Sequence, residues 1–280
     1  MIINHNISAM MACRYMNIHS ALASKAMQRI SSGRRINSAA DDPAGLSISE
    51  RMQAQIRGLQ QASRNAQVGV SLVQVADGAL NETHVMLQRL RELAVMASNG
   101  TLTTQDRKNT QIEINQLTIG INKIATDTQF NTITPLDPSI GSNGGSNLTV
   151  QVGANVGQVM GIPVQDSKSR ALNITDASGN GLDISIPEKA SDAIKIYEDA
   201  INQVSSSRAS LGAKQNVLES SIDYMGTTID NLTDASSKIT DADMAKEMIE
   251  YSKENILSQV CQLMFVQANH QAESVIELLR

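Results

Sequence analysis

The sequence predicts a mainly α-helical protein in which the N- and C-terminal flanks form a long antiparallel coiled-coil rod, with a small β-hairpin region between them. Three observations lead to this prediction. The 280 residues include no Trp, two Phe and four Tyr, so Ala, Ile, Leu, Val and 13 Met must fill the core, as in side-by-side helices. Apolar residues recur at helical spacing on both sides of the centre. Residues that break helices concentrate in the middle.

The N-terminal flank carries a seam of mostly apolar residues at alternating spacings of three and four. Its members are Leu59, Ala62, Ala66, Gly69, Val73, Ala76, Leu80, Thr83, Leu87, Leu90, Ala94 and Ala97. Only Gly69 and Thr83 interrupt an apolar pattern that lasts more than five heptads. Such a pattern predicts one long helix that is packed along its whole length.

A second helix is expected after a short turn. Asn99-Gly100 is a favourable cap for the end of the first helix, and Thr103 or Thr104 is a candidate N-cap for the next. The seam then resumes as Thr110, Ile114, Leu117, Ile121, Ile124 and Thr128. Because the turn is short, the sequence predicts an antiparallel helical hairpin, which we place at residues 46–129.

The C-terminal flank repeats the pattern. A seam with the same spacing runs from Ala190 to Ile239, about 50 residues or ~75 Å at 1.5 Å per residue. Helices as long as these are best satisfied by packing against each other. We therefore expect a rod domain over residues 46–235, in which residues 190–235 form the long return helix.

The central segment, residues 131–189, changes character. Pro135, Pro138, Pro163 and the run GSNGGSN break helices. Around a turn at residues 153–155, apolar residues alternate as they do in strands: Leu148, Val150 and Val152 before it, Ile162 and Val164 after it. Leu182, Ile184 and Ile186 suggest a further strand. We expect a small β-hairpin region without a substrate pocket of its own.

The chain ends are apolar in a different way. Residues 260–266 are apolar except for Gln262, so a helix here would be apolar most of the way round, and one partner helix cannot cover it. Our hypothesis is that the ends are weakly ordered in the monomer and fold when many copies pack together. The residues predicted to carry polymerisation are Ile3, Ile7, Met10, Ile18, Leu22, Ile256, Leu263, Phe265, Ile276, Leu278 and Leu279.

Charge and motifs argue against several classes of function. A net charge of −5 disfavours nucleic acid as main partner, and Arg34-Arg35, followed by two Asp, favours a structural loop over an anion site. No stretch is long and apolar enough to span a membrane, and the features of a cleavable signal are missing. The protein is therefore expected to be cytoplasmic or exported by a route that reads no such signal. Without His-Glu-x-x-His, CxxC, GxSxG, Walker or GxGxxG motifs, the sequence predicts no catalytic residue, metal or cofactor.

Long motifs at both flanks carry a family resemblance. They include MIINHNISAM at the start, SSGRRINSAADDPAGLSISERM, QASRNAQVGVSLVQVADGALNETHVMLQRLRELAV, DRKNTQIEINQL, ITDADMAKEMIEYSKENILSQ and the final LLR. In order and position these closely resemble bacterial flagellin, the subunit of the flagellar filament. The match covers roughly residues 1–130 and 190–280, and the short middle leaves no room for the outer domains of many flagellins.

The resemblance implies a terminal, polymerising domain of paired helices, which we place at residues 1–45 and 236–280. It also implies a secreted, extracellular protein that is exported unfolded by the flagellar type III apparatus. The implied partners are further copies of itself, an export chaperone, the filament cap and the hook–filament junction proteins. Nothing in the resemblance implies a cofactor, nucleic acid or membrane insertion.

The resemblance further implies that a host Toll-like receptor for flagellin contacts the rod helices at Arg89, Leu90, Glu92, Leu93 and Glu113. A packing role competes with this one, because Leu90 lies on the seam and Arg89 with Glu92 has the spacing of a solvated ion pair. We favour assembly or packing as the role of these residues, with receptor binding an incidental use of the same surface.

Cys13 and Cys261 are unusual for the family. If the terminal helices pair with residue 1 near residue 280, Cys13 lies opposite about residue 268, roughly 10 Å along the axis from Cys261. That separation is too large for a relaxed bridge within one chain. The hypothesis at this level is two reduced thiols or a cross-link between subunits.

Three rivals to a filament subunit remain. A filament-junction protein of the same export class shares the helical ends but lacks such unbroken motifs. An enzyme-bearing flagellin needs a metalloprotease insert, for which the middle is too short. A secreted coiled-coil effector or adhesin is distinguished by whether the purified protein assembles into tubes.

Overall fold

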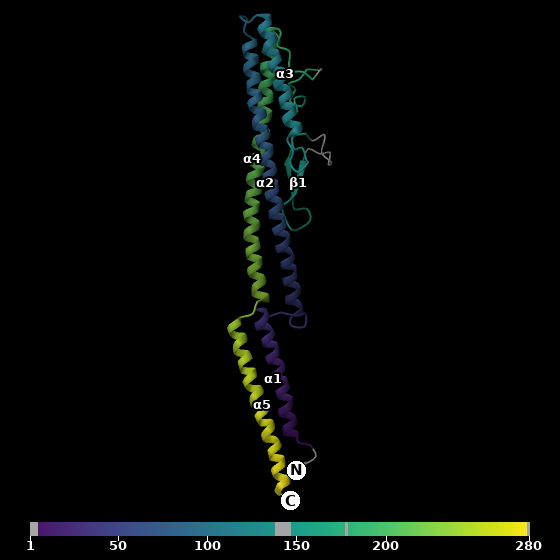
Figure 1. Cartoon of the computed structure of the whole chain (residues 1–280), viewed down its shortest axis with the longest axis vertical. Coiled ribbons are helices and arrows are strands. Elements are labelled where there is room, and N and C mark those ends of the chain that lie inside the picture. Colours follow the sequence, from purple (N-terminus) through teal and green to yellow (C-terminus); the bar gives the residue numbers. More distant parts are fainter. Residues whose placement is uncertain (1–4, 138–146, 177–178, 279–280) are drawn as a thin grey trace. The chain divides into compact units, whose positions relative to one another are not determined.

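The computed structural model describes residues 5–137, 147–176 and 179–278. In these ranges it contains five helices and one two-stranded sheet (Figure 1). They are α1 (Ile7–Ser32), α2 (Pro43–Ala97), α3 (Thr104–Asp127), β1 (Asn147–Gln151), β2 (Val159–Pro163), α4 (Pro187–Thr240) and α5 (Met244–Leu278). The predicted mainly helical class with a small β-hairpin is confirmed.

The chain divides into two compact units. Unit 1 combines Met1–Ile56 with Asp230–Arg280, and unit 2 is Arg57–Ile229. The division therefore falls inside α2 and α4 rather than at a helix end. Unit 2 contains most of α2 and α4, all of α3 and the β-hairpin, while unit 1 contains α1 and α5.

The core of unit 2 follows the seam read from the sequence. Every seam residue of α2 from Ala62 to Ala97 is buried, including the two that interrupt the apolar pattern. Thr83 is accommodated because its hydroxyl donates to the carbonyl of Ala79 at 3.0 Å. Gly69 is required by close packing, because a Cβ there would lie 3.3 Å from Val150 of β1 and 3.5 Å from Leu218 of α4.

A charged residue on the α4 seam has a partner across the helix pair. The Nε of Arg208 donates to Oδ1 of Asp77 on α2 at 2.8 Å. This ion pair raises the pKa of Arg208, chiefly through the hydrogen bond to Asp77. The charge of Arg208 in the α4 seam is thus paired with the carboxylate of Asp77 within unit 2.

The turn between α2 and α3 differs in part from the prediction. Thr103, not Thr104, is the N-cap of α3, and it forms a capping box with Asp106. Gly100 is not the expected left-handed cap of α2, since the described glycines with positive φ are Gly33, Gly157 and Gly179. Instead the guanidinium of Arg107 donates to the carbonyl of Asn99 at 3.1 Å. The last turn of α2 is closed by backbone N–H groups, from Ser98 to the carbonyl of Ala94 and from Asn99 to that of Met96, and Arg107 fixes the turn that follows.

The hairpin has the predicted position. β1 and β2 are antiparallel, with Leu148 opposite Ile162 and Val150 opposite Met160. The connecting turn is held by Gln151, whose Nε2 donates to the carbonyls of Gly153 and Asn155, both at 2.8 Å. Leu148, Val150 and Met160 pack against the core of unit 2, and Ile162 lies within it.

The further strand expected around residues 182–186 is wrong. The described segment pairs with a side chain on α3 in place of a neighbouring strand. Gln111 donates to the carbonyl of Leu182 at 3.0 Å and accepts from the N–H of Ile184 at 2.9 Å. Ile184 is fully buried, so its apolar character reflects packing over α3 and not a sheet.

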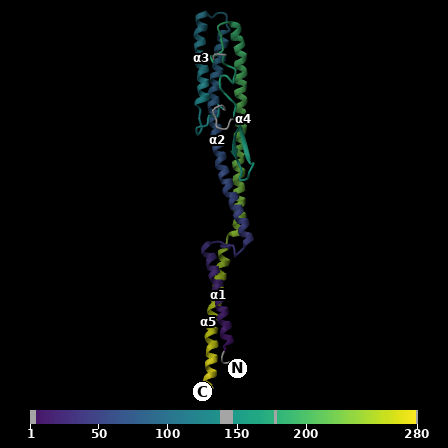
Figure 2. The same ribbon diagram turned by 90° about the vertical axis from the view of Figure 1, so that its right-hand side faces the viewer.

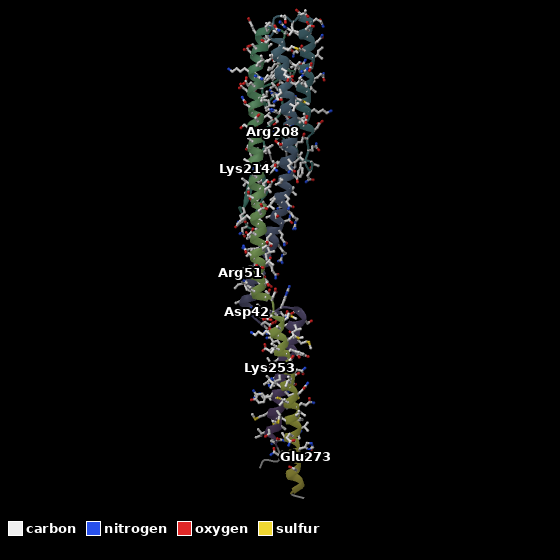
Figure 3. All side chains as sticks on the ribbon, turned by 90° about the vertical axis from the view of Figure 1, so that its left-hand side faces the viewer. Asp42, Arg51, Arg208, Lys214, Lys253 and Glu273 are labelled. Atoms are coloured by element: carbon white, nitrogen blue, oxygen red, sulfur yellow. The ribbon has the colours of Figure 1, made fainter. Side chains whose placement is uncertain are left out.

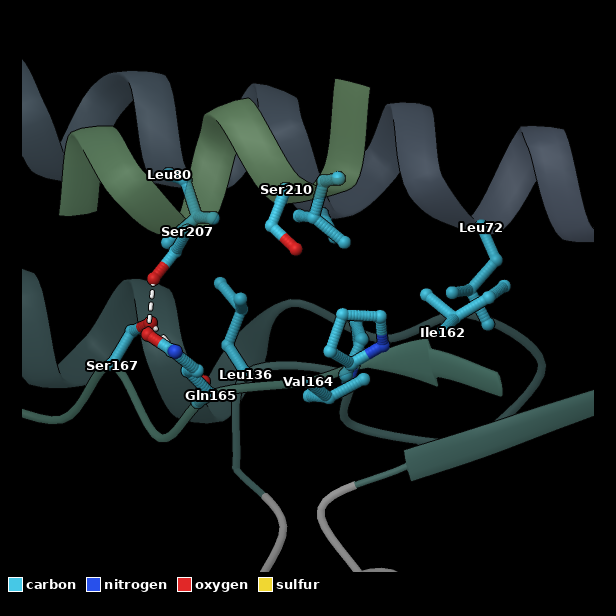
Figure 4. Close-up of a pocket in the computed structure, with 13 residues that line it drawn as sticks. Leu72, Leu80, Leu136, Ile162, Val164, Gln165, Ser167, Ser207 and Ser210 are labelled. Atoms are coloured by element: carbon cyan, nitrogen blue, oxygen red, sulfur yellow. Dashed lines mark hydrogen bonds between the residues drawn. The ribbon is translucent and has the colours of Figure 1, made fainter. Parts of the chain in front are cut away.

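A small, partly open cavity lies where α2 and α4 meet the segment after β2 (Figure 4). Its volume is about 20 Å³, enough for about one water molecule. Apolar side chains such as Leu72, Leu136 and Ile162 line most of it. At one end the hydroxyl of Ser207 donates to Oε1 of Gln165. A cavity of this size does not hold a small-molecule substrate.

Unit 1 is built on two antiparallel helices, which lie side by side in both views (Figures 1 and 2). α1 ends at Gly33, whose φ of 68° is the left-handed conformation that glycine adopts at a helix end. Gly33 and the residues after it bind the end of α4 and the connection to α5: the N–H of Arg35 donates to the carbonyl of Thr240, and the carbonyl of Gly33 accepts from the N–H of Ala242. The Arg35 guanidinium also donates to the carbonyl of Ile239 at 2.6 Å. These contacts fit the structural-loop interpretation of the two arginines.

The pairing register of unit 1 corrects an expectation. The Nδ2 of Asn6 donates to the carbonyl of Ala268 at 2.9 Å, and His19 meets Glu254 at 2.6 Å. Residue 13 therefore lies opposite about residue 261, and not opposite residue 268 as a pairing of residue 1 with residue 280 would require. The contacts of Asn6 and His19 shift the register by about two turns of helix.

Candidate assembly surface

The face on which α1 meets α5 contains small and polar residues. The buried residues of α1 are Ala9 and Ala26, at 5% and 4% exposure. On α5 the buried residues are Glu247 and Glu254. Among the described side chains of the two helices, no large apolar one is fully buried. The α1–α5 pair therefore lacks a core of large apolar side chains in its described residues, and many of its large apolar side chains are exposed.

Ion pairs hold this face together. Nδ1 of His19 lies 2.6 Å from Oε2 of Glu254, and the Arg29 guanidinium donates to Oε1 of Glu247 at 3.3 Å. Lys253 adds a cation at 3.3 Å from the other oxygen of Glu254. The hydrogen bond from His19, with Lys253, lowers the pKa of the Glu254 carboxyl although burial opposes this. The contacts of His19 with Glu254 and of Arg29 with Glu247 specify the register, since each joins one level of α1 to one level of α5.

One apolar stripe runs along α1. Its exposed members are spaced by three or four residues and thus share one helical face: Ile7, Met11, Tyr15, Ile18 and Leu22. Of the residues predicted for polymerisation, Ile7, Ile18 and Leu22 belong to this stripe, while Met10 is exposed beside it at 62%. Met11 and Tyr15 are stripe members that the sequence analysis did not select, although the same spacing marks them.

A second apolar stripe runs along α5. Ile249, Ile256, Val260 and Leu263 are all exposed, Leu263 at 71%, and their spacings place them on one face. This face points away from α1, because the intervening Glu254 faces α1. Figure 3 shows side chains projecting from α5 around Lys253. Phe265 is half-buried.

Four predicted residues receive no side-chain description. Ile3 and Leu279 lie outside the described residues. Ile276 and Leu278 belong to α5 by their backbone, but their side chains are outside the described set. The stripes are thus defined by residues 7–22 and 249–263.

The second predicted surface lies on unit 2. Arg89 of α2 binds Glu113 of α3, with Nε to Oε1 at 3.0 Å, and Glu92 at 3.1 Å. Both carboxylates raise the pKa of Arg89, Glu113 most strongly. Leu90 and Leu93, at 0% and 1% exposure, are core residues. The surface that another molecule can reach is therefore Arg89, Glu92 and Glu113.

The described part of the chain contains no cluster of three or more His, Cys, Asp or Glu side chains that would suit a metal ion. No described helix has the length and hydropathy of a membrane span.

A helical chain whose two ends form one unit with outward-facing apolar stripes is the architecture of a subunit that is completed by neighbours. Two family models match it: the bacterial flagellin N-terminal helical region at residues 3–139 and the bacterial flagellin C-terminal helical region at residues 194–279. The chain belongs to the bacterial flagellin family.

Individual relatives match over their whole length. The chain is 46% identical to a flagellin of Halalkalibacterium halodurans, with 100% of both chains covered, and 44% identical to a flagellin of Bacillus subtilis, with 99% of both covered. It is 42% identical to the flagellar filament 33 kDa core protein of Treponema phagedenis, again over 100% of both.

Solved structures are similar as well. The crystal structure of Bacillus cereus flagellin matches with a TM-score of 0.51 and 26% identity, covering 58% of this chain and 88% of that one. A putative flagellar hook-associated protein from Vibrio parahaemolyticus matches with a TM-score of 0.55 over 72% of this chain and 100% of that one. At 16% identity, the second likeness concerns the fold alone.

Proposed function

We propose that this chain is the structural subunit of an extracellular bacterial flagellar filament, in which many copies pack through unit 1 to form the helical polymer used in swimming. The observation that carries the proposal is the arrangement of unit 1. Its two helices contact each other through Ala and ion-paired Glu side chains and leave an apolar stripe on each helix uncovered. Burying such stripes against other copies is the main source of free energy for assembly.

The two apolar stripes would contact different neighbouring subunits. The α5 stripe faces away from α1, whereas the α1 stripe lies on a different side of the pair, so a single neighbour cannot cover both. Each subunit therefore contacts at least two others through unit 1. A subunit with two such surfaces propagates a polymer and does not stop at a dimer.

The filament role is favoured over a junction role by the relatives. Those matched over their whole length are named flagellins or filament core proteins, whereas the likeness to a hook-associated protein is one of fold. The family is one of structural proteins, in agreement with a mechanical and not a catalytic role.

The proposal also includes specific protein partners. Family membership supports an export apparatus, an export chaperone, a filament cap and junction proteins as partners. The exposed Arg89, Glu92 and Glu113 support a surface used in assembly, which a host Toll-like receptor for flagellin contacts incidentally. A receptor would read this surface through charge, because both leucines of the motif are buried.

Polymerisation of stripe variants tests the proposal. Ile256→Gln with Leu263→Gln makes the α5 stripe polar without touching the face that meets α1. We expect a chain with unchanged helix content that forms no filaments, measured by circular dichroism, sedimentation and electron microscopy. Gln262→Asn is the matched control, because Gln262 is exposed on α5 but off the stripe. Normal filaments from the double variant would refute the role of the stripe.

A further inference from the structure

Two cysteines from opposite ends of the sequence lie at the same level of unit 1. Cys13 is seven residues after Asn6 and six before His19; Cys261 is seven residues before Ala268 and seven after Glu254. Asn6 contacts Ala268 and His19 contacts Glu254, at 2.9 and 2.6 Å. Because both helices rise equally per residue, Cys13 and Cys261 fall side by side between these two contacts.

The helix faces are also suitable. Cys261 shares the face of Glu254, which is buried against α1, since a spacing of seven residues returns to the same face. Cys13 lies one turn after buried Ala9, at the edge of the face that meets α5. Alanines on the α1 face let the two backbones approach closely. Both thiols are free and half-buried, so that a small reagent reaches them.

We propose that Cys13 and Cys261 of one chain are a redox-sensitive pair that oxidises to an intrachain disulfide and clamps α1 to α5. The sulfur of Cys13 now accepts only a long contact from Nδ2 of Asn17 at 4.0 Å. Closing the bridge requires the Cys13 side chain to leave Asn17 and turn about its Cα–Cβ bond toward α5. The inference rests on the α1–α5 register and does not depend on how subunits assemble.

The reaction balances with a low-molecular-weight disulfide as oxidant. One cysteine thiolate attacks a sulfur of the reagent, forms a mixed disulfide and releases one small thiol. The thiolate of the second cysteine then displaces the other small thiol and closes the protein disulfide. The chain loses two electrons and two protons overall, and the reagent is reduced to two thiols.

The bridge would strengthen a weak interface. The helices are joined by small side chains and ion pairs, and the disulfide closes a very long loop, the condition in which cross-linking restricts the unfolded chain most. Amide exchange in the first turns of α1 should therefore slow by at least about tenfold on oxidation.

The test is oxidation of assembled protein, and in parallel of the soluble chain, with oxidised glutathione, followed by alkylation and a non-reducing gel. We expect a band of monomer mobility from which trypsin releases residues 1–14 linked to residues 254–280, as the positions of Arg14 and Lys253 dictate. The linked peptides should separate on reduction and be missing from Cys13→Ala.

A matched variant tests the register. Ser20→Cys in the Cys13→Ala background keeps the helical face but moves the thiol one heptad, about 10 Å, along α1. We expect it to form no intrachain bridge with Cys261. The linked peptide in dimer bands only, two alkylated thiols after oxidation, or equal bridging by the Ser20→Cys variant would each overturn the proposal.

Discussion

Gly58 shows how single residues position the β-hairpin on α2. A Cβ at this glycine would lie 2.8 Å from Cβ and 3.3 Å from Cα of Ala154 in the hairpin turn. Gly69, further along α2, admits Val150 in the same way. At these two glycines the hairpin therefore approaches α2 more closely than a side chain would allow without a shift.

Alanine substitutions at two glycines of α2 distinguish the effect of the hairpin contact on stability from the effect of helix propensity. Gly78→Ala should raise the free energy of unfolding of unit 2 by about 0.5–1 kcal/mol, because nothing lies within 4 Å of its Cβ position. Gly58→Ala should be less stable than Gly78→Ala by about 1–3 kcal/mol, because the hairpin backbone must shift. Urea denaturation measures both, and equal stabilisation would contradict the close contact.

Glu254 gives unit 1 a dependence on acid. The pKa of its carboxyl lies below the ordinary value of 4.5, and the main cause is the hydrogen bond that His19 makes with the ionised form. A carboxyl with a lowered native pKa stabilises the folded state above its unfolded pKa, and that stability is lost as the pH falls through the native pKa. The α1–α5 contact should therefore weaken on the acid side of pH 4.5.

Glu254→Gln tests this dependence. The variant should start less stable at neutral pH and lose less between pH 5 and pH 3 than the parent chain, as measured by amide exchange of α1 in assembled protein. Glu250→Gln, exposed on the same helix, is the control and should retain the parent's pH profile. A parent-like profile for Glu254→Gln would show that the His19 contact does not contribute.

At the scale of the element, helix ends are specified by side chains several residues apart. The start of α3 depends on the Thr103 hydroxyl, which donates to Asp106 Oδ2 at 2.6 Å and accepts from the Asp106 N–H at 3.3 Å. The hydrogen bond from the Thr103 hydroxyl to the Asp106 carboxylate, with that from the Thr103 N–H, lowers the pKa of Asp106. The first turn of α3 thus caps its own helix through Asp106 and holds the preceding turn through Arg107.

The two adjacent threonines make a controlled pair of variants. Thr103→Ala removes the cap and should lower the free energy of unfolding of unit 2 by about 1 kcal/mol. Thr104→Ala should change it by only a few tenths, because in the described part of the chain its hydroxyl makes no hydrogen bond. Denaturation midpoints of the two variants measure this difference. Equal losses of stability in both variants would mean that the Thr103 cap contributes little.

At the scale of the whole molecule, the two units differ in what stabilises them. Unit 2 has a continuous apolar core formed by α2, α3, α4 and the hairpin. In the described residues of α1 and α5, burial is limited to two alanines and two ion-paired glutamates. The stability of unit 1 should therefore depend on neighbouring copies to a degree that unit 2 does not require.

Hydrogen exchange of the dilute monomer measures this difference. Amides of α1 and α5 should exchange far faster than those of the buried α2 seam, and assembly should protect them by several orders of magnitude. The seam amides of α2 serve as internal control and should change little. Firmly protected α1 and α5 in a strictly monomeric sample would contradict the proposal that these helices fold on assembly.

Local patterns determined the helices and their buried faces. The α2 seam could be read residue by residue because a helix fixes which side chains share a face, whatever lies opposite. Likewise, the apolar stretch around Leu263 revealed a surface that one helix cannot cover. The sequence limited the N-cap of α3 to Thr103 or Thr104 but did not distinguish between them, since both residues suit the position.

What the sequence left open depended on contacts between distant segments. The α1–α5 register follows from which side chains of α1 meet Glu254 and Glu247, and no periodicity specifies that choice. The Leu182–Ile186 segment alternates like a strand, yet the amide of Gln111 takes its hydrogen bonds. Leu93 belongs to a motif that resembles a receptor site, but packing in unit 2 buries it. Periodicity determines faces along one helix, whereas register, pairing and exposure are decided by energies between elements that only the tertiary structure brings together.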